Sequence, residues 1–416
     1  MARRARLIIT LGLATLLAAT AASPALAQRP GLDRAALRQT LDAVTAGGIY
    51  GTYSHVRDGR ESWRGASGVA DKETGRPARP DMYHRIGSIT KTFVATAVLQ
   101  QVERGAVDLD APVGRYLPGL LPDQRITVRM LLNHTSHISD YDHIIFSTLD
   151  SVEANRTRKF TRKELVEIGL GGGTTGQPGD LPGSYSNTNY AVLGLLLDKV
   201  TGIGAEHYIT RHVIKRAGLS DTFFPRTPYL PRPHSKAYES LGGAFDPPRD
   251  FSVYDMSWGG MAGAIVSTMP DLNRFNRALL SGRLVGAAQL AQMRTTVPVT
   301  PGPGVTETVD YGLGIFTLPL PCGRVWGHDG GVIGMGTMSF SSEDGSRQFS
   351  SGVNLMNHPD AAAGAYAQAV HLVTALCGPG SATSASVGEL LPALSPLAES
   401  RAAGPLAAQR RTAHGE

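Results

Sequence analysis

The stretch Ile86-Gly-Ser-Ile-Thr-Lys-Thr-Phe93 begins a run in which apolar residues recur at helical spacing. The run extends from Ser88 to about Arg104, and Gly105 suits its C-terminal end. Residues three apart share one face of a helix, so the Ser88 hydroxyl and the Lys91 amine can meet. A serine hydroxyl is a good nucleophile only when a neighbouring base takes its proton, and a partly buried lysine can help to do so. Taken alone, a serine and a lysine three residues apart are equally typical of a solvent-exposed helix face.

Strand-like segments lie on both sides of this helix in the sequence. Residues 48–56 and 61–69 alternate and are rich in strand formers, and the turn-like segment between them predicts a β-hairpin. A helix is expected at about residues 360–375, after four strand-like segments: Tyr311 to Leu318, Arg324 to Gly327, Gly336 to Phe340 and Gln348 to Asn354. We therefore predict an α/β plus all-α fold, in which helices flank an antiparallel sheet and a helical subdomain is inserted at roughly residues 106–270.

Two further motifs carry groups suited to acid–base chemistry. Tyr185-Ser186-Asn187 offers a phenol that can move protons and an amide that can bind both a lysine and a substrate. His328-Asp329-Gly330-Gly331 places an imidazole among glycines that permit close approach of a strand backbone. Taken singly, the first motif also fits a helix cap and the second a glycine-rich strand end.

The N-terminus has the features of a secretory signal peptide. Three arginines precede an apolar run from Leu7 to about Ala19, and Ala25-Leu-Ala27 is a suitable cleavage site. We expect residues 1–27 to be removed and the protein to be secreted, without a stable membrane span; the alternative is an uncleaved anchor. Removing those arginines lowers the formal net charge from +5 to 5 − 3 = +2. With no basic block interleaved with aromatic residues, we expect no nucleic-acid partner.

The remainder of the chain, at 42% apolar and 18% charged residues, is typical of a globular domain at residues 28–378. Its two cysteines, Cys322 and Cys377, are interpreted as one disulfide in an oxidising compartment, or else as two free buried thiols. Neither has the closely spaced partners of a metal site. The Ala/Ser/Pro/Gly-rich residues 379–416 are predicted to be a disordered tail.

In combination, Ser-x-x-Lys, then Tyr-x-Asn about a hundred residues later, then His-x-Gly resemble the pattern of penicillin-recognising serine hydrolases. The chain resembles most the secreted D-alanyl-D-alanine carboxypeptidases of streptomycetes and, more distantly, class C β-lactamases. The resemblance spans about residues 30–378. Besides the motifs and the two cysteines, it includes Tyr116-Leu-Pro-Gly-Leu-Leu-Pro122, Ile126-Thr-Val-Arg129, Ser257-Trp258, Gly263-Ala-Ile-Val-Ser267 and Tyr311-Gly-Leu-Gly314.

The resemblance implies a catalytic role for each motif. Ser88 would be the nucleophile, Lys91 its activator, Tyr185 the proton relay to the leaving amine, and His328 the group beside that tyrosine. Backbone N–H groups of Ser88 and Gly331 would form the oxyanion hole. The resemblance implies no cofactor and no metal. The implied substrate-contacting or pocket residues are Asn187, Phe146, Trp258, Asp329, Gly330 and Gly331.

Two departures from the family pattern concern the substrate and one loop. In similar carboxypeptidases, hydroxyls around His-x-Gly and an arginine on the preceding strand hold the substrate carboxylate, whereas this chain has Asp329, Gly331 and Phe316 there. An acidic Asp329 would not attract a carboxylate. In the loop His134-Thr-Ser-His137-Ile138, His137 replaces a glycine, which puts the turn in doubt if positive φ is needed. That histidine could lie near the pocket or simply be exposed.

We therefore expect a monomeric serine carboxypeptidase or D-peptidase that acts on peptidoglycan stem peptides and is acylated by β-lactams. An esterase or D-aminopeptidase on the same scaffold is the alternative, because the carboxylate anchor is missing. A β-lactamase is disfavoured, since nothing indicates how a deacylating water would be held. A non-catalytic wall-binding protein is disfavoured by the intact Ser88, Lys91, Tyr185 and Asn187.

Overall fold

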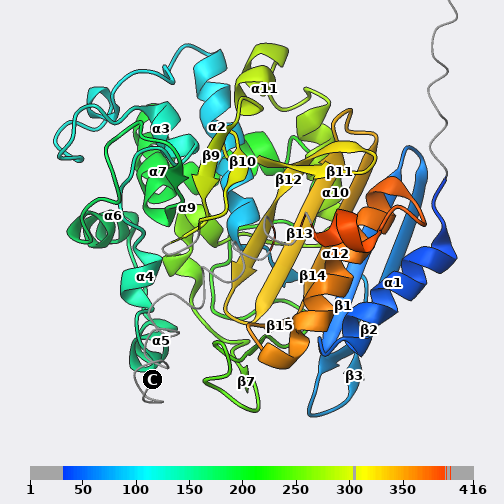
Figure 1. The fold of residues 1–416 in the computed structure, drawn as a ribbon. Coiled ribbons are helices and arrows are strands. Elements are labelled where there is room, and N and C mark those ends of the chain that lie inside the picture. The colour runs from blue at the N-terminus through cyan, green and yellow to red at the C-terminus, as the bar shows by residue number, and fades with distance from the viewer. Residues whose placement is uncertain (1–30, 303–305, 389, 391–393, 395–416) are drawn as a thin grey trace, which may run out of the picture.

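The computed structural model describes residues 31–302, 306–388, 390 and 394. A ten-stranded sheet forms its centre (Figure 1). In spatial order its strands are β3 (Arg76–Pro77), β2 (Glu61–Asp71), β1 (Gly51–Asp58), β14 (Arg347–Val353), β13 (Met335–Ser342), β12 (Gly323–Val332), β11 (Phe316–Leu320), β10 (Val309–Tyr311), β9 (Val297–Thr300) and β5 (Gly183–Ser184). Neighbouring strands are antiparallel except for β5 and β9, which are parallel. The predicted antiparallel sheet flanked by helices is confirmed, with this one parallel pair added.

The sheet joins the two ends of the chain directly. β1 and β2 form the predicted hairpin, and β1 pairs on its other edge with β14, from Thr52 opposite Val353 to Asp58 opposite Arg347. The N-terminal hairpin is therefore continuous with the C-terminal strands.

One predicted strand is divided in the structure. The run from Tyr311 to Leu318 forms the end of β10 and the start of β11, which pair with each other. Between them Gly314 adopts φ 71°, and a Cβ atom there would lie 2.5 Å from the Cβ of Ala95. A tight turn against α2 (Thr90–Glu103) thus interrupts a segment whose alternation alone predicted one strand.

Helices cover both faces of the sheet. α1 (Arg34–Ala46) and α12 (Ala362–Cys377) lie over one face, and α10 (Met269–Leu280) and α2 lie over the other (Figure 1). We predicted one apolar face for the helix after Ser88, but α2 is buried on all sides from Thr90 to Gln101. α2 is buried because it contacts both α10 and the helical region. Toward α10, the rings of Phe93 and Phe275 stack with centroids 3.7 Å apart.

The helical region lies beside the sheet, next to β9 and β10 (Figure 1). Its helices are α3 (Val128–Leu132), α4 (Asp142–Ile145), α5 (Leu149–Asn155), α6 (Arg162–Gly171), α7 (Asn187–Thr201), α8 (Ala205–Ile209) and α9 (Gly260–Gly263). α7 packs against both α2 and α6. The segment predicted as an inserted helical subdomain therefore contacts the sheet domain through α2.

The two cysteines form a disulfide between Cys322 and Cys377, with Cα atoms 5.2 Å apart. It links the turn between β11 and β12 to the end of α12. Of the predicted tail, residues 384–388 are helical, and the side chains of Val387, Leu390 and Leu394 are buried in the apolar layer that includes α12. Residues 395–416 and the predicted signal peptide lie outside the described residues. In the described part of the chain, no helix is both long enough and apolar enough to cross a membrane.

Three buried histidines make stability depend on pH. Burial lowers the pKa of His55, His84 and His371 to about 3 each. These groups are neutral when folded and take up protons at pH 6.5 when unfolded, so their contribution to stability is present above pH 6.5 and is lost as pH falls toward 3. Each contributes a slope of about 1.4 kcal/mol per pH unit in that range.

We expect His371→Gln to reduce the pH dependence of the free energy of unfolding between pH 6 and pH 4 by about one proton. His371 joins α12 to α1 through Thr40 Oγ1 at 2.8 Å and to β1 through Ser54 Oγ at 3.0 Å, contacts that an amide can replace in part. Urea unfolding at several pH values measures the slope. His358→Gln, at a partly exposed histidine, is the control; equal slopes for all three proteins would refute the assignment.

Candidate active site

Ser88 lies in a short 3₁₀ turn, η1 (Gly87–Ile89), that leads directly into α2. Gly87 has φ 54°, a conformation that favours glycine. A Cβ atom on Gly87 would lie 2.7 Å from the carbonyl oxygen of Gly331, and one on Gly330 would lie 1.9 Å from the backbone oxygen just before this turn. The glycines therefore allow β12 to pack directly against the turn that carries Ser88.

Lys91 is completely buried and points at Ser88 from the first turn of α2. Its Nζ donates to Ser88 Oγ at 3.0 Å, to Asn187 Oδ1 at 2.6 Å and to the backbone oxygen of Ala262 at 2.9 Å. Three acceptors match the three N–H groups of an ammonium. The predicted contact between serine and lysine is thus present, in a site where water does not compete for either group.

Tyr185 follows β5 and lies over the same lysine. Lys91 Nζ is 4.8 Å from the centre of the Tyr185 ring. The same ring stacks on His134, with centroids 4.2 Å apart. Only 4% of Tyr185 is exposed. The structure brings this tyrosine from a distant segment to the Ser88–Lys91 pair.

His328 lies on β12 with both ring nitrogens engaged. Nδ1 is 2.6 Å from the backbone oxygen of Asp329, and Nε2 is 2.9 Å from the hydroxyl of Tyr311. A carbonyl only accepts, so Nδ1 carries the proton, and in the neutral ring Nε2 accepts from Tyr311. The centroids of His328 and Tyr185 are 6.4 Å apart. Tyr311, whose hydroxyl contacts His328, is an additional member of the site.

Asn187 connects the lysine to two carboxylates. Its Oδ1 faces Lys91, and its Nδ2 donates to Asp140 Oδ2 at 2.9 Å and to Asp142 Oδ2 at 2.7 Å. The amide therefore bridges a cation on one side and two anions on the other. Sequence reasoning missed this acidic pair, although the Asp-Tyr-Asp spacing close to Phe146 was a visible signal.

Phe146 and Trp258, the predicted pocket walls, lie against each other. Their ring centroids are 5.0 Å apart at right angles. Tyr141 fixes the backbone here by donating to the carbonyl oxygen of Trp258 at 2.7 Å. Their contact with a substrate stays a prediction.

The position where similar carboxypeptidases carry an arginine is occupied by an apolar ring. Phe316 is fully buried, and its centroid is 5.2 Å from that of His328. Asp329 follows on β12, with Oδ1 3.4 Å from His328 Nδ1. The two positions supply a phenyl ring and a carboxylate instead of a cation.

The His137 loop keeps the conformation that glycine would favour. His137 has φ 57°, in the left-handed region. Its side chain is buried rather than exposed, with Nδ1 3.0 Å from Thr175 Oγ1 and Nε2 3.0 Å from the backbone oxygen of Asp180. These contacts compensate for the backbone strain and hold the glycine-rich loop near residues 171–176.

The first half of β12 is paired on both edges, whereas its second half is paired with β13 on one edge. β11 pairs with β12 as far as Gly327, whereas β13 continues to pair as far as Val332. The implied oxyanion donors are close to each other beside this edge: a Cβ atom on Gly87 would lie 2.8 Å from Gly331 N, and one on Gly330 would lie 3.1 Å from Ser88 N.

No group of His, Cys, Asp or Glu side chains in the described residues has the arrangement of a metal site. The groups present suit acyl transfer: a hydroxyl, an amine, a phenol and an imidazole, with backbone N–H groups beside the hydroxyl.

Comparisons with known proteins agree with this architecture. The D-stereospecific amidohydrolase from a Streptomyces species is 35% identical, with a TM-score of 0.74, over 84% of this chain and 100% of that one. Penicillin-binding protein 4* of Bacillus subtilis (strain 168) is 27% identical over 69% of this chain and 64% of its own length. Esterase EstB of Burkholderia gladioli is 33% identical over 46% of this chain and 53% of its own length. The chain thus spans less than two thirds of the length of these two curated relatives.

Fold and site together define a serine hydrolase in which a lysine of the same helix contacts the nucleophile. The family model described as Beta-lactamase matches residues 34–369. The chain belongs to this family.

Proposed function

We propose that this protein hydrolyses amide bonds of D-amino acid derivatives through an acyl-enzyme on Ser88. The observation that carries the proposal is the 3.0 Å contact between Lys91 Nζ and Ser88 Oγ in a buried site. The D-stereospecific amidohydrolase, similar over its whole length, supports the choice of substrate class.

The chemistry divides into two half-reactions. In its neutral form, Lys91 takes the Ser88 proton while Oγ attacks the carbonyl carbon, and the backbone N–H groups of Ser88 and Gly331 stabilise the oxyanion. Tyr185, next to the ammonium so formed, gives its proton to the leaving nitrogen as the C–N bond breaks and regains a proton from Lys91, which restores the neutral amine. In the second half-reaction, the oxygen of a water molecule bonds to the ester carbon while the water gives one proton to Lys91. That proton passes to Ser88 Oγ as the C–O bond of the ester breaks.

The charge around the site favours an ammonium over a carboxylate on the substrate. Asp140 and Asp142 border Asn187, which contacts Lys91. Phe316 fills the position from which an arginine would bind a carboxylate. A charge-assisted contact contributes about 1.5–3 kcal/mol, so a free amine should raise kcat/KM by roughly 10- to 100-fold.

A D-alanyl-D-alanine carboxypeptidase is the second candidate, supported by the similarity to penicillin-binding protein 4*. One experiment separates the two. We expect D-alaninamide and D-phenylalaninamide to be hydrolysed faster than their L-enantiomers, and N-acetylation to reduce kcat/KM by at least tenfold.

Asp142→Asn should remove most of that preference for the free amine. Asp310→Asn, at an exposed carboxylate on β10, should not. If instead N-acetylated D-Ala-D-Ala peptides release D-alanine faster than D-alaninamide is hydrolysed, the carboxypeptidase is the correct assignment.

A further inference from the structure

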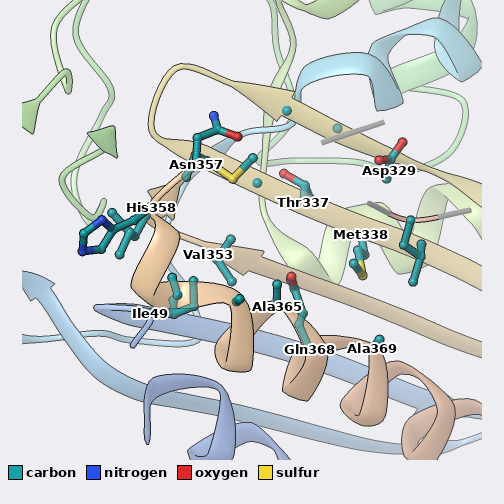
Figure 2. Close-up of a pocket in the computed structure, with 18 of the residues that line it drawn as sticks. Ile49, Asp329, Thr337, Met338, Val353, Asn357, His358, Ala365, Gln368 and Ala369 are labelled. Atoms are coloured by element: carbon teal, nitrogen blue, oxygen red, sulfur yellow. The ribbon is translucent and has the colours of Figure 1, made fainter. Parts of the chain in front are cut away.

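A groove of about 480 Å³ lies between α12 and the strands β12, β13 and β14, on the face of the sheet opposite α10 (Figure 2). Met338 and Val353 line the sheet side, and Ala365, Gln368 and Ala369 line the helix side. Most of the lining is apolar, and the volume lies in the range of small-molecule sites.

The groove exists because small residues face each other across it. Gly331 on β12 and Gly336 on β13 are directly opposite in the register. A Cβ atom on Gly336 would lie 2.6 Å from Met356 Sδ, so even an alanine would begin to fill the space. Opposite them, Ala365 and Ala369 are one helical turn apart and present only methyl groups.

One end of the groove is part of the catalytic strand. Asp329, Gly330 and Gly331 line it and also border the Ser88 turn. The Cβ direction of Gly330 points at that turn, so the side-chain directions of Asp329 and Gly331 point to the opposite face, where the groove lies. The groove and the Ser88 turn therefore share the segment Asp329–Gly331 of β12.

The pairing of β12 indicates how a substrate reaches the groove. Beyond Gly327 the edge of β12 extends past the end of β11, and the oxyanion donor Gly331 is on this part. A substrate backbone along that edge places successive substituents on alternate faces of the sheet. One substituent faces Ser88, and the next faces the groove.

We propose that this groove is a subsite for an apolar aryl or branched alkyl group of the substrate, attached next to the scissile bond. The proposal rests on the proposed function, and it narrows the substrate class to derivatives of apolar amino acids. Burial of such a group out of water favours it over a methyl group by about tenfold or more in kcat/KM.

The decisive variant is Ala365→Leu, which places a larger side chain in the groove from an exposed position on α12. Ala363→Leu is the matched control, since Ala363 is also exposed on α12 but does not line the groove. For wild type we expect higher kcat/KM with D-phenylalaninamide than with D-alaninamide, and with p-nitrophenyl phenylacetate than with p-nitrophenyl acetate.

Ala365→Leu should lower kcat/KM for the two aryl substrates by at least tenfold and change it for the small ones by less than twofold. Ala363→Leu should behave as wild type with all four. An equal effect of Ala365→Leu on small and aryl substrates, or no effect on either, overturns the subsite and leaves the proposed hydrolase intact.

Binding tests the groove without turnover. The Ser88→Ala protein should bind D-phenylalaninamide more tightly than D-alaninamide in calorimetry, and adding Ala365→Leu should abolish the difference. If no amide or ester is hydrolysed by wild type, the proposed function fails, and this binding difference alone decides whether the groove takes the aryl group. Equal binding of the two amides refutes it.

Discussion

Ser88→Ala is expected to abolish turnover, with kcat reduced by about 10⁴-fold or more. The reason is chemical, because the 3.0 Å contact with Lys91 Nζ prepares Ser88 Oγ for attack and alanine has no hydroxyl. Intact-mass analysis after exposure to penicillin should show one covalent adduct on wild type and none on the variant. Following the wild-type adduct with time also gives the deacylation rate.

Ser186→Ala is the control for this experiment. Ser186 is buried close to Tyr185, and its hydroxyl makes only a long contact, 3.3 Å, to the backbone oxygen of Ser139 among the described residues. This variant should keep activity within a few fold. Equal labelling of wild type and Ser88→Ala would show that the nucleophile has been misassigned.

Lys91→Met is expected to lower the rate of Ser88 acylation by about 10²- to 10⁴-fold, the usual contribution of a general base. Methionine has a similar length and cannot donate or accept the transferred proton. It also leaves Asn187 Oδ1 and the Ala262 oxygen without the donor they share, at a cost of about 1–3 kcal/mol for each buried group. The second-order rate of labelling by a fluorophosphonate measures the effect on chemistry separately from stability.

Lys199→Met is the matched control, because Lys199 is exposed near the end of α7. It should leave both the labelling rate and the melting temperature close to wild type. Labelling of Lys91→Met at the wild-type rate, in a folded protein, would exclude Lys91 as the activator of Ser88.

Much of this architecture could be predicted because it follows from local patterns. Alternation and a turn predicted the β1–β2 hairpin, and helical spacing predicted α2. The Ser88–Lys91 contact follows from a three-residue separation on a helix, which is a property of the backbone itself.

Features that depend on distant segments could not be derived from periodicity. The pairing of Asn187 with Asp140 and Asp142 requires knowing how the loop before α4 passes the start of α7. The contact of Tyr311 with His328 depends on the turn that separates β10 from β11, which the sequence analysis treated as one strand. Both contacts result from tertiary packing, which the periodicity of each segment does not encode.

The pairing of β1 with β14 also constrains the order of events during synthesis. An emerging chain exposes the N-terminal hairpin first, yet the partner of β1 is about 300 residues further on, as Ser54 opposite Ser351 shows. Loop-closure entropy over such a span makes early docking unfavourable, and such long-range contacts are associated with slow folding. The nascent polypeptide should therefore remain unfolded until its last strands have left the ribosome, which leaves time for chaperones or a translocation machinery to engage it.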